Sequence, residues 1–435
     1  KLERETETIR GLSLIARSDQ HVTAAPVSAG ATLVSLAGSL SVGVIDTDTR
    51  STVAGNASIN PQNQGAAAAQ AVRVAALDET NLTGVSTTLP FSGLTPVATG
   101  AVTVGIMTKD VLAQLGGTIQ ASGNVGVEAF SEQDLRQISA AVPLGILGGF
   151  AGSVGVARTN GKVRATLLAD SQLRAGGDLT VEAREDMDFD QVIGGVTGGL
   201  NANGGAIAVG VQEGSVEARI AERARTDAGG LTRVLADAKQ KVTTATVSAQ
   251  IGLANVGGSL GVRVADLDTL AEIAADARIN EDRTLAGNTQ SVLVTARNAL
   301  SLEGGSGSGS LGLIGIGGSA DIAVARNTTI ARIQDRARVF ASEDISVVAN
   351  GEKSVLATGI TGSLSLGLGF AGSVAVAVLG GAADSRGVDQ LQYSRAKDDA
   401  DDRDGLLRAA NTLLAADQTS LLDNRNGAAG LVNDP

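Results

Sequence analysis

Ala37–Val44 reads AGSLSVGV, in which a small residue, a glycine and a serine precede alternating branched and small residues. The same pattern returns as TGAVTVGI, AGSVGVAR, GGAIAVGV, GGSLGVRV, GGSADIAV and AGSVAVAV, which begin at residues 99, 151, 204, 257, 317 and 371. Successive copies start 62, 52, 53, 53, 60 and 54 residues apart. A nearly constant period of this length indicates one structural unit that is copied along an axis, so the repeat decides the fold class.

Each repeat contains two further alternating segments. One precedes the glycine-rich strand by roughly 26 residues, and its copies begin at Leu12, Val72, Val125, Leu179, Leu231, Val292 and Ile345. The other has an Ala-x-Leu or Ala-x-Ile core and lies at residues 113–115, 165–167, 218–220, 271–273 and 331–333. A period of two predicts strands with one buried face. Because no segment of helical period lies between consecutive strands, we expect an all-β chain without βαβ units.

The repeats predict an elongated parallel β-helix, or β-solenoid, of about seven repeats of ~53 residues. Half a period, about 26 residues, suits one turn of such a coil, so we expect two coils per repeat. About 14 coils at the strand spacing of about 4.8 Å would form a rod on the order of 65–70 Å long. Hydrophobic residues make up 43% of the chain but aromatic residues only 2%, which predicts a thin interior of Val, Ile, Leu and Ala.

The repeat pattern breaks near residue 384, so we divide the chain into a repeat domain, 1–383, and a C-terminal segment, 384–435. This segment contains the charged run Lys397–Asp404 and then Gly405–Ala416, whose leucines recur at helical spacing. We expect a charged linker and a short amphipathic helix that caps the open end of the solenoid or acts as a docking tail. The start at Lys1, without an initiator methionine or signal peptide, predicts a processed product or a piece of a longer protein.

Charge and composition exclude several classes of function. The net charge is −12, and no basic patch is visible, so we predict no nucleic-acid partner. His21 is the only histidine and cysteine is absent, which excludes a His/Cys metal site and a Cys–His pair within one chain. We expect His21 to be a solvated residue of a polar turn, Ser18–His21. With no Gly-x-Ser-x-Gly elbow, the sequence predicts no enzyme.

The strongest group of carboxylates is Asp186, Asp188 and Asp190. In a strand these three side chains share one face about 7 Å apart, with Met187 and Phe189 pointing inward. They form a weak candidate Ca²⁺ site or the acidic groups of a polysaccharide-cleaving β-helix; a solvated strand face is the plainer interpretation. No other metal and no cofactor is predicted.

Two shorter acidic pairs follow glycine-rich strands, Asp46 with Asp48 and Asp266 with Asp268. Their recurrence predicts a turn with shared geometry, and weak Ca²⁺ binding there is an alternative. Two uncharged stretches, 138–157 and 359–383, are long enough to cross a bilayer. Because both coincide with strands of the repeat and are rich in glycine, we predict no membrane span.

LRAGGDLTVEA at Leu173–Ala183 and GSVGVA at Gly152–Ala157 resemble the repeats of very large bacterial exoproteins. These are the leukotoxin-like and filamentous-haemagglutinin-like adhesins, and the resemblance covers about residues 10–380. It implies a right-handed parallel β-helix, export to the cell surface and a fibrous or adhesive role.

The sequence therefore predicts a non-enzymatic structural protein, secreted or held on the bacterial cell surface. It would be a fibrous adhesin, or a protomer that self-associates end to end into an extracellular filament or sheath, with a host or glycan surface as its ligand. The alternative is a β-helical polysaccharide lyase or hydrolase, or a glycan-binding module, that uses surface carboxylates. The scarcity of aromatic residues counts against that alternative, since sugar platforms are usually aromatic.

Overall fold

The computed structural model describes residues 10–384, with gaps at 32, 34, 94 and 381–382. The chain divides into two compact units, 1–386 and 387–435. The predicted charged linker and amphipathic helix lie outside the described residues.

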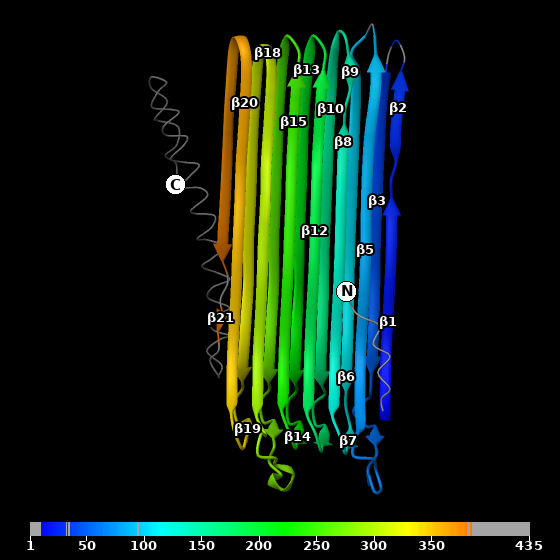
Figure 1. Cartoon of the computed structure of the whole chain (residues 1–435), viewed down its shortest axis with the longest axis vertical. Coiled ribbons are helices and arrows are strands. Elements are labelled where there is room, and N and C mark those ends of the chain that lie inside the picture. The colour runs from blue at the N-terminus through cyan, green and yellow to red at the C-terminus, as the bar shows by residue number, and fades with distance from the viewer. Residues whose placement is uncertain (1–9, 32, 34, 94, 381–382, 385–435) are drawn as a thin grey trace, which may run out of the picture. The chain divides into compact units, whose positions relative to one another are not determined.

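The described part is nearly all β, and every pair of neighbouring strands is parallel. Long strands run side by side along the vertical direction of Figure 1, and short strands lie at their lower ends. The predictions of an all-β class and of parallel strands are confirmed. The one helical element is a single 3₁₀ turn, η1 (Arg283–Leu285), in the described residues.

The strands form two long rows and one short row. The first long row contains β1 (Arg10–Ala24), β2 (Val27–Ala31), β5 (Gln70–Ser92), β8 (Val125–Ala141), β9 (Leu144–Gly145), β12 (Leu179–Gly198), β15 (Thr232–Ile251) and the first parts of β18 (Val292–Ile333) and β20 (Ile345–Gly380). The second contains β3 (Ser35–Thr52), β6 (Val97–Leu115), β10 (Gly148–Leu167), β13 (Asn201–Ile220), β16 (Ala254–Ile273), the second parts of β18 and β20, and β21 (Ala383–Asp384). The short row contains β4 (Ser58–Ile59), β7 (Thr118–Ala121), β11 (Gln172–Ala175), β14 (Arg225–Ala228), β17 (Arg278–Ile279) and β19 (Arg338–Val339).

Strand pairing shows how much chain one layer uses. Leu179 pairs with Val125, 54 residues before it, and with Thr232, 53 residues after it. Each repeat therefore adds one strand to each long row and makes a single layer. The prediction of two coils per repeat is wrong, because segments half a period apart lie in opposite rows instead of pairing with each other.

This pairing also changes the expected dimensions. Strands such as β12 are 20 residues long, which corresponds to about 66 Å along the strand. Seven strands per long row at about 4.8 Å separate the first and last strands by about 29 Å. The long direction of this unit is therefore that of the strands, and the rod of about 14 coils is not formed.

An aliphatic core lies between the rows near the short row. The Ala-x-Leu/Ile segments continue the glycine-rich strands, and Ala165 and Leu167 at the end of β10 are fully buried. They pack with Val181 of β12 and Leu173 of β11 in the largest cluster of buried side chains. This half of the interior matches the predicted Val, Ile, Leu and Ala lining.

The interior changes toward the other ends of the long strands. Ser86, Ser139, Thr246 and Ser306 occupy equivalent inward positions of four layers and are all buried, and Ile193 occupies this position in the layer between Ser139 and Thr246. Thr246 Oγ1 donates to Ser306 Oγ at 2.7 Å. The predicted lining of Val, Ile, Leu and Ala is therefore wrong for this half of the interior, where small polar side chains occupy many inward positions.

Candidate functional site

The candidate Ca²⁺ residues lie on one outward face of β12. Asp186 and Asp188 are exposed and Asp190 is partly exposed, whereas Met187 and Phe189 between them are buried. The predicted alternation is therefore confirmed. Asp186 Oδ2 lies 3.5 Å from Lys239 Nζ of the next layer.

Two carboxylates that the sequence analysis did not single out lie beside this row. Glu132 and Asp134 of β8 pair in register with Asp186 and Asp188. Partial burial, and then the charges of Asp188 and Asp190, raise the pKa of Asp134. An alignment of the repeats that begin at Val125 and Leu179 would have brought these acidic positions together.

The geometry of these carboxylates does not single out a metal centre. Across the described residues, no group of three or more His, Asp or Glu side chains is arranged to hold a metal ion. The Ca²⁺ site at Asp186, Asp188 and Asp190 stays a prediction.

Five residues that were expected in turns lie inside strands. Asp46 and Asp48 lie in β3, and Asp266 and Asp268 lie in β16, where all four face outward, so the shared acidic turn is wrong. His21 lies in β1 instead of the predicted polar turn. Its side chain is exposed as expected, with Nε2 3.0 Å from Asp19 Oδ1 and Nδ1 2.9 Å from Asn81 Nδ2. Strands longer than the quoted motifs carry these polar residues on their solvent face.

The two uncharged stretches, 138–157 and 359–383, contribute to strands β8 to β10 and to β20 and β21. The described residues contain no helix with the length and hydropathy needed to cross a membrane.

Buried charged residues form polar contacts inside the aliphatic interior. Lys109 of β6 contacts Asp78 of β5, and both side chains are fully buried. Burial lowers the pKa of Lys109, although the Asp78 carboxylate opposes this effect. Glu185 of β12 is also buried and accepts a hydrogen bond from Gln133 Nε2 at 2.8 Å, while its Oε2 has no hydrogen-bond partner among the described residues.

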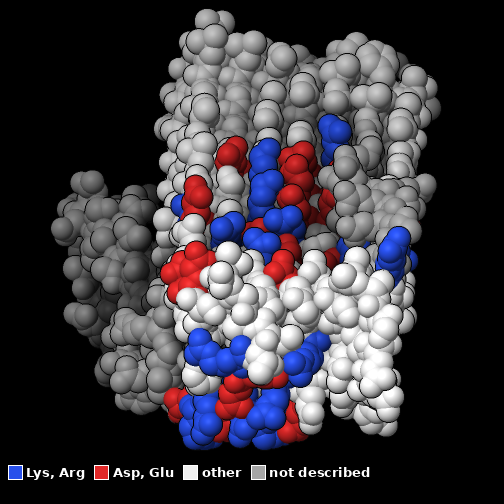
Figure 2. All heavy atoms as spheres, turned by 60° about the horizontal axis from the view of Figure 1, so that its bottom comes forward, with Lys and Arg blue, Asp and Glu red and all other residues white. Residues whose placement is uncertain are grey.

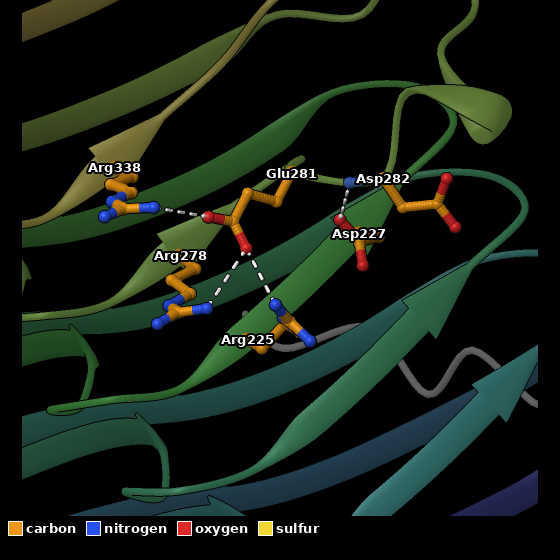
Figure 3. A network of polar contacts seen from close by, with 6 residues as sticks. All are labelled: Arg225, Asp227, Arg278, Glu281, Asp282 and Arg338. Atoms are coloured by element: carbon orange, nitrogen blue, oxygen red, sulfur yellow. Dashed lines mark hydrogen bonds and ion pairs between the residues drawn. The ribbon is translucent and has the colours of Figure 1, made fainter.

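Charged side chains gather at the end of the unit that carries the short row (Figure 2). There Arg225, Arg278 and Arg338 pair in register along β14, β17 and β19. Glu281 accepts from all three, at 2.8 Å from Arg225 Nη2, 3.4 Å from Arg278 Nη1 and 3.3 Å from Arg338 Nη1 (Figure 3). The hydrogen bond from Arg225 is the main reason that the pKa of Glu281 is lowered. This carboxylate offsets the repulsion within the arginine column.

The first and last layers leave inward positions open to solvent. Leu14 of β1 is 39% exposed, whereas Val74, which occupies the same position one layer on, is fully buried. Ile345 of β20 is 50% exposed, whereas its partner Val292 is 1% exposed. Within the described residues, β1, β3 and β20 each pair along one edge of the stack. As far as the described strands show, both ends therefore present apolar side chains and backbone groups that no neighbouring strand pairs.

The open ends match each other position by position. Aligned through the strand register, inward Leu12, Leu14 and Ala16 of β1 correspond to Ile345, Val347 and Ala349 of β20. In the second long row AGSLSVGVI at 37–45 corresponds in the same way to AGSVAVAVL at 371–379. A second molecule placed on β20 would continue the same columns of side chains.

No protein-family model, no curated protein and no solved structure matches the chain. The resemblance to exoprotein repeats and the function that it implies stay predictions.

Proposed function

We propose that this chain is a non-enzymatic structural protein whose repeats form a flattened β-solenoid and whose copies stack head to tail into an extracellular filament or sheath. The observation that carries the proposal is the match between the open first and last layers. In this proposal, the filament lies on the bacterial cell surface and adheres to a host or glycan surface.

Stacking removes two unfavourable features at once. It pairs the free edges of β1 and β3 of one copy with the free edge of β20 of the next copy. It also covers inward apolar side chains such as Leu14 and Ile345, and burying apolar surface contributes about 25 cal/mol per Å². Because the contact joins different surfaces of the two copies without closing a ring, it propagates.

One pair of outward residues makes stacking sensitive to ions. If the strand register continues from one copy into the next, Asp19 of one copy lies next to Glu352 of its neighbour. Both occupy the position that Glu79, Glu132 and Asp186 occupy in the layers between them. Like charges directly opposite each other on adjacent strands are destabilising. Ca²⁺ would therefore favour assembly.

Negative-stain electron microscopy of the full chain over a range of concentrations, with and without Ca²⁺, tests the proposal. We expect filaments whose length increases with concentration. Leu14→Lys and Ile345→Lys each place a charge on a surface that stacking buries, and each should abolish the filaments.

Ile360→Lys is the matched control, because Ile360 is an exposed outward residue of the same strand β20. It should leave filaments intact. Isolated particles of the wild-type chain at every concentration, or equal effects of Ile345→Lys and Ile360→Lys, would contradict head-to-tail stacking.

A further inference from the structure

The outward side of the second long row is apolar over one half of its strands. Three adjacent outward columns of this row contain branched apolar residues in every layer, apart from Arg158 and Ala320. We call these columns, with the outward columns of Leu36 and Gly38, the apolar face. The Leu36 column contains Leu36, Ala98, Phe150, Asn203, Val256, Ile316 and Phe370, of which only Asn203 is polar. The three columns are Leu40, Val102, Val154, Ile207, Leu260, Ala320, Val374; Val42, Val104, Val156, Val209, Val262, Ile322, Val376; and Val44, Ile106, Arg158, Val211, Val264, Val324, Val378.

The apolar face has a definite lower boundary. Beyond it the next outward column contains Asp46, Thr108, Asn160, Glu213, Asp266 and Arg326. Arg158 is paired with Glu213 at this boundary, with Nη2 and Oε2 2.9 Å apart. The face is therefore a bounded patch of the surface.

Its size exceeds what a monomeric protein usually exposes. The five columns of the apolar face span about 27 Å along the strands, and the seven strands span about 29 Å across them. The face therefore has a projected area of roughly 800 Å². The largest apolar patch of a typical monomer is about 300–600 Å², whereas a stable protein interface buries about 800 Å² on each partner. The patch thus has the area of one side of a specific dimer.

The apolar face contains a groove and an adjacent ridge whose shapes are complementary. Glycine occupies one outward column in all seven layers, at 38, 100, 152, 205, 258, 318 and 372. Four of these glycines, Gly205, Gly258, Gly318 and Gly372, line a groove of about 580 Å³ together with Ile207 and Leu260. The adjacent column, two residues along each strand, contains Ile207 and Leu260 and forms a ridge about 7 Å from the groove.

We propose that two copies of this chain pair through their apolar faces, with the ridge of each copy seated in the glycine groove of the other. A two-fold axis that runs along the columns, midway between ridge and groove, brings each ridge opposite a groove and the Leu36 column opposite the Val42 column. The Val44 column then lies at the rim, so that four of the five columns, roughly 600 Å² in projection, face each other. Each layer then faces the same layer of the partner, so that Leu260 lies opposite the partner's Gly258. This axis preserves the direction of stacking, so a pair can still extend head to tail. The pairing goes beyond the proposed stacking and does not depend on it.

Two glycines of β18 provide a matched test by sedimentation equilibrium. Gly318 lies in the groove and Gly309 faces outward on the opposite row, and a Cβ at either position would meet no atom within 4 Å. Gly318→Val fills the groove and should weaken dimerisation at least tenfold, whereas Gly309→Val should not. A monomeric wild-type chain at about 100 µM, or equal effects of the two variants, would overturn the pairing.

Cysteine cross-linking tests the register, because the chain contains no natural cysteine. Gly258→Cys and Leu260→Cys should each fail to form disulfide dimers alone and should form them when mixed under oxidising conditions. Cross-linking of either variant alone, without the mixed product, would overturn this register.

Electron microscopy separates this proposal from the proposed function. Single threads would show stacking without pairing, discrete pairs would show pairing without stacking, and two-stranded filaments would show both. A wild-type chain that stays monomeric but floats with phosphatidylcholine vesicles, in a manner that Gly318→Val alters, would assign the face to lipid and overturn the pairing.

Discussion

Arg263 and Asp321 form a fully buried, bidentate ion pair across adjacent layers of the second long row. Arg263 Nη1 donates to Asp321 Oδ1 at 2.9 Å and Nη2 donates to Oδ2 at 2.7 Å. The backbone N–H of Thr358 also donates to Asp321 Oδ2, at 3.0 Å. A Cβ on Gly304 would lie 1.6 Å from Arg263 Nη1, so glycine at this position gives the guanidinium the space that it occupies.

Asp321→Asn should destabilise the protein strongly. The substitution leaves a buried guanidinium without its counter-charge, and breaking a buried pair in this way costs about 3–5 kcal/mol. Urea unfolding followed by circular dichroism measures the loss. Glu213→Gln removes an exposed partner of Arg158 and should change the free energy of unfolding by less than about 1 kcal/mol. Similar losses in both variants would show that the buried pair is not important for stability.

Glu185 makes the stability of the fold depend on pH near neutrality. Burial raises its pKa from 4.5 to about 7, against the opposing effect of the Lys109 charge. A carboxyl group with a raised pKa in the folded state favours folding below its unfolded pKa, and this contribution is lost as the pH rises through the folded pKa. We therefore expect stability to fall between about pH 4.5 and pH 7, by roughly 3 kcal/mol.

Glu185→Gln is the test, because glutamine keeps the shape and cannot ionise. Urea midpoints measured from pH 5 to pH 8 should fall in the wild type and stay nearly constant in the variant. Gly161→Ala offers a second check: its Cβ would lie 2.6 Å from Glu185 Oε1, so we expect a lower midpoint throughout this range. A wild-type profile parallel to that of Glu185→Gln would contradict the raised pKa.

The repeat period made much of the fold predictable. Alternation at Met187 and Phe189 identified the inward face of β12 correctly, because a strand exposes every second side chain. The pairing of strands was harder to predict, since the pattern does not say whether segments half a period apart lie side by side or face each other. The observed strands of 20 residues are much longer than the usual five or six, and this length accounts for the error.

The polar interior could not be predicted from neighbouring residues. Lys109 and Asp78 are 31 residues apart, and Arg263 and Asp321 are 58 residues apart, so each partner looks like a surface residue in its own segment. The acidic neighbours of Asp188 were accessible in principle, because Asp134 occupies the same position of the preceding repeat. The matching ends required the strand register, which three-dimensional pairing supplies.

Neutralising Asp188 should ease the crowding of carboxylates on β8 and β12. Asp188 and Asp190 both contribute to the raised pKa of Asp134, so Asp188→Asn should lower that pKa. The raised pKa destabilises the ionised folded state, and the variant should therefore have a higher urea midpoint at pH 7, with a smaller gain in 1 M NaCl because salt screens exposed charges.

If Asp186, Asp188 and Asp190 bind Ca²⁺, millimolar Ca²⁺ will raise the wild-type midpoint, and Asp188→Asn will remove that increase.

Arginine and aspartate alternate along the turns that precede the short row, in a backbone conformation that favours glycine. Asp170, Arg223, Asp276 and Arg336 have φ values of 58°, 58°, 57° and 55°. Arg223 donates to both carboxylate oxygens of Asp170, at 2.7 and 2.8 Å, and Arg336 does the same to Asp276 at the same distances. These ion pairs compensate for a conformation that glycine adopts without steric strain.

Arg223→Gly separates the two effects. The variant loses the ion pair but relieves the backbone, and salt weakens exposed ion pairs without changing backbone strain. In 1 M NaCl its melting temperature should therefore exceed that of the wild type by roughly 2 °C, a shift typical of small stability changes in a chain of this size. Arg184→Gly is the control, because Arg184 pairs with Asp237 at 3.0 Å but lies within strand β12, where glycine is unfavourable. It should lower the melting temperature at every salt concentration. A lower melting temperature of Arg223→Gly in high salt would mean that the ion pair, and not the backbone, dominates at this turn.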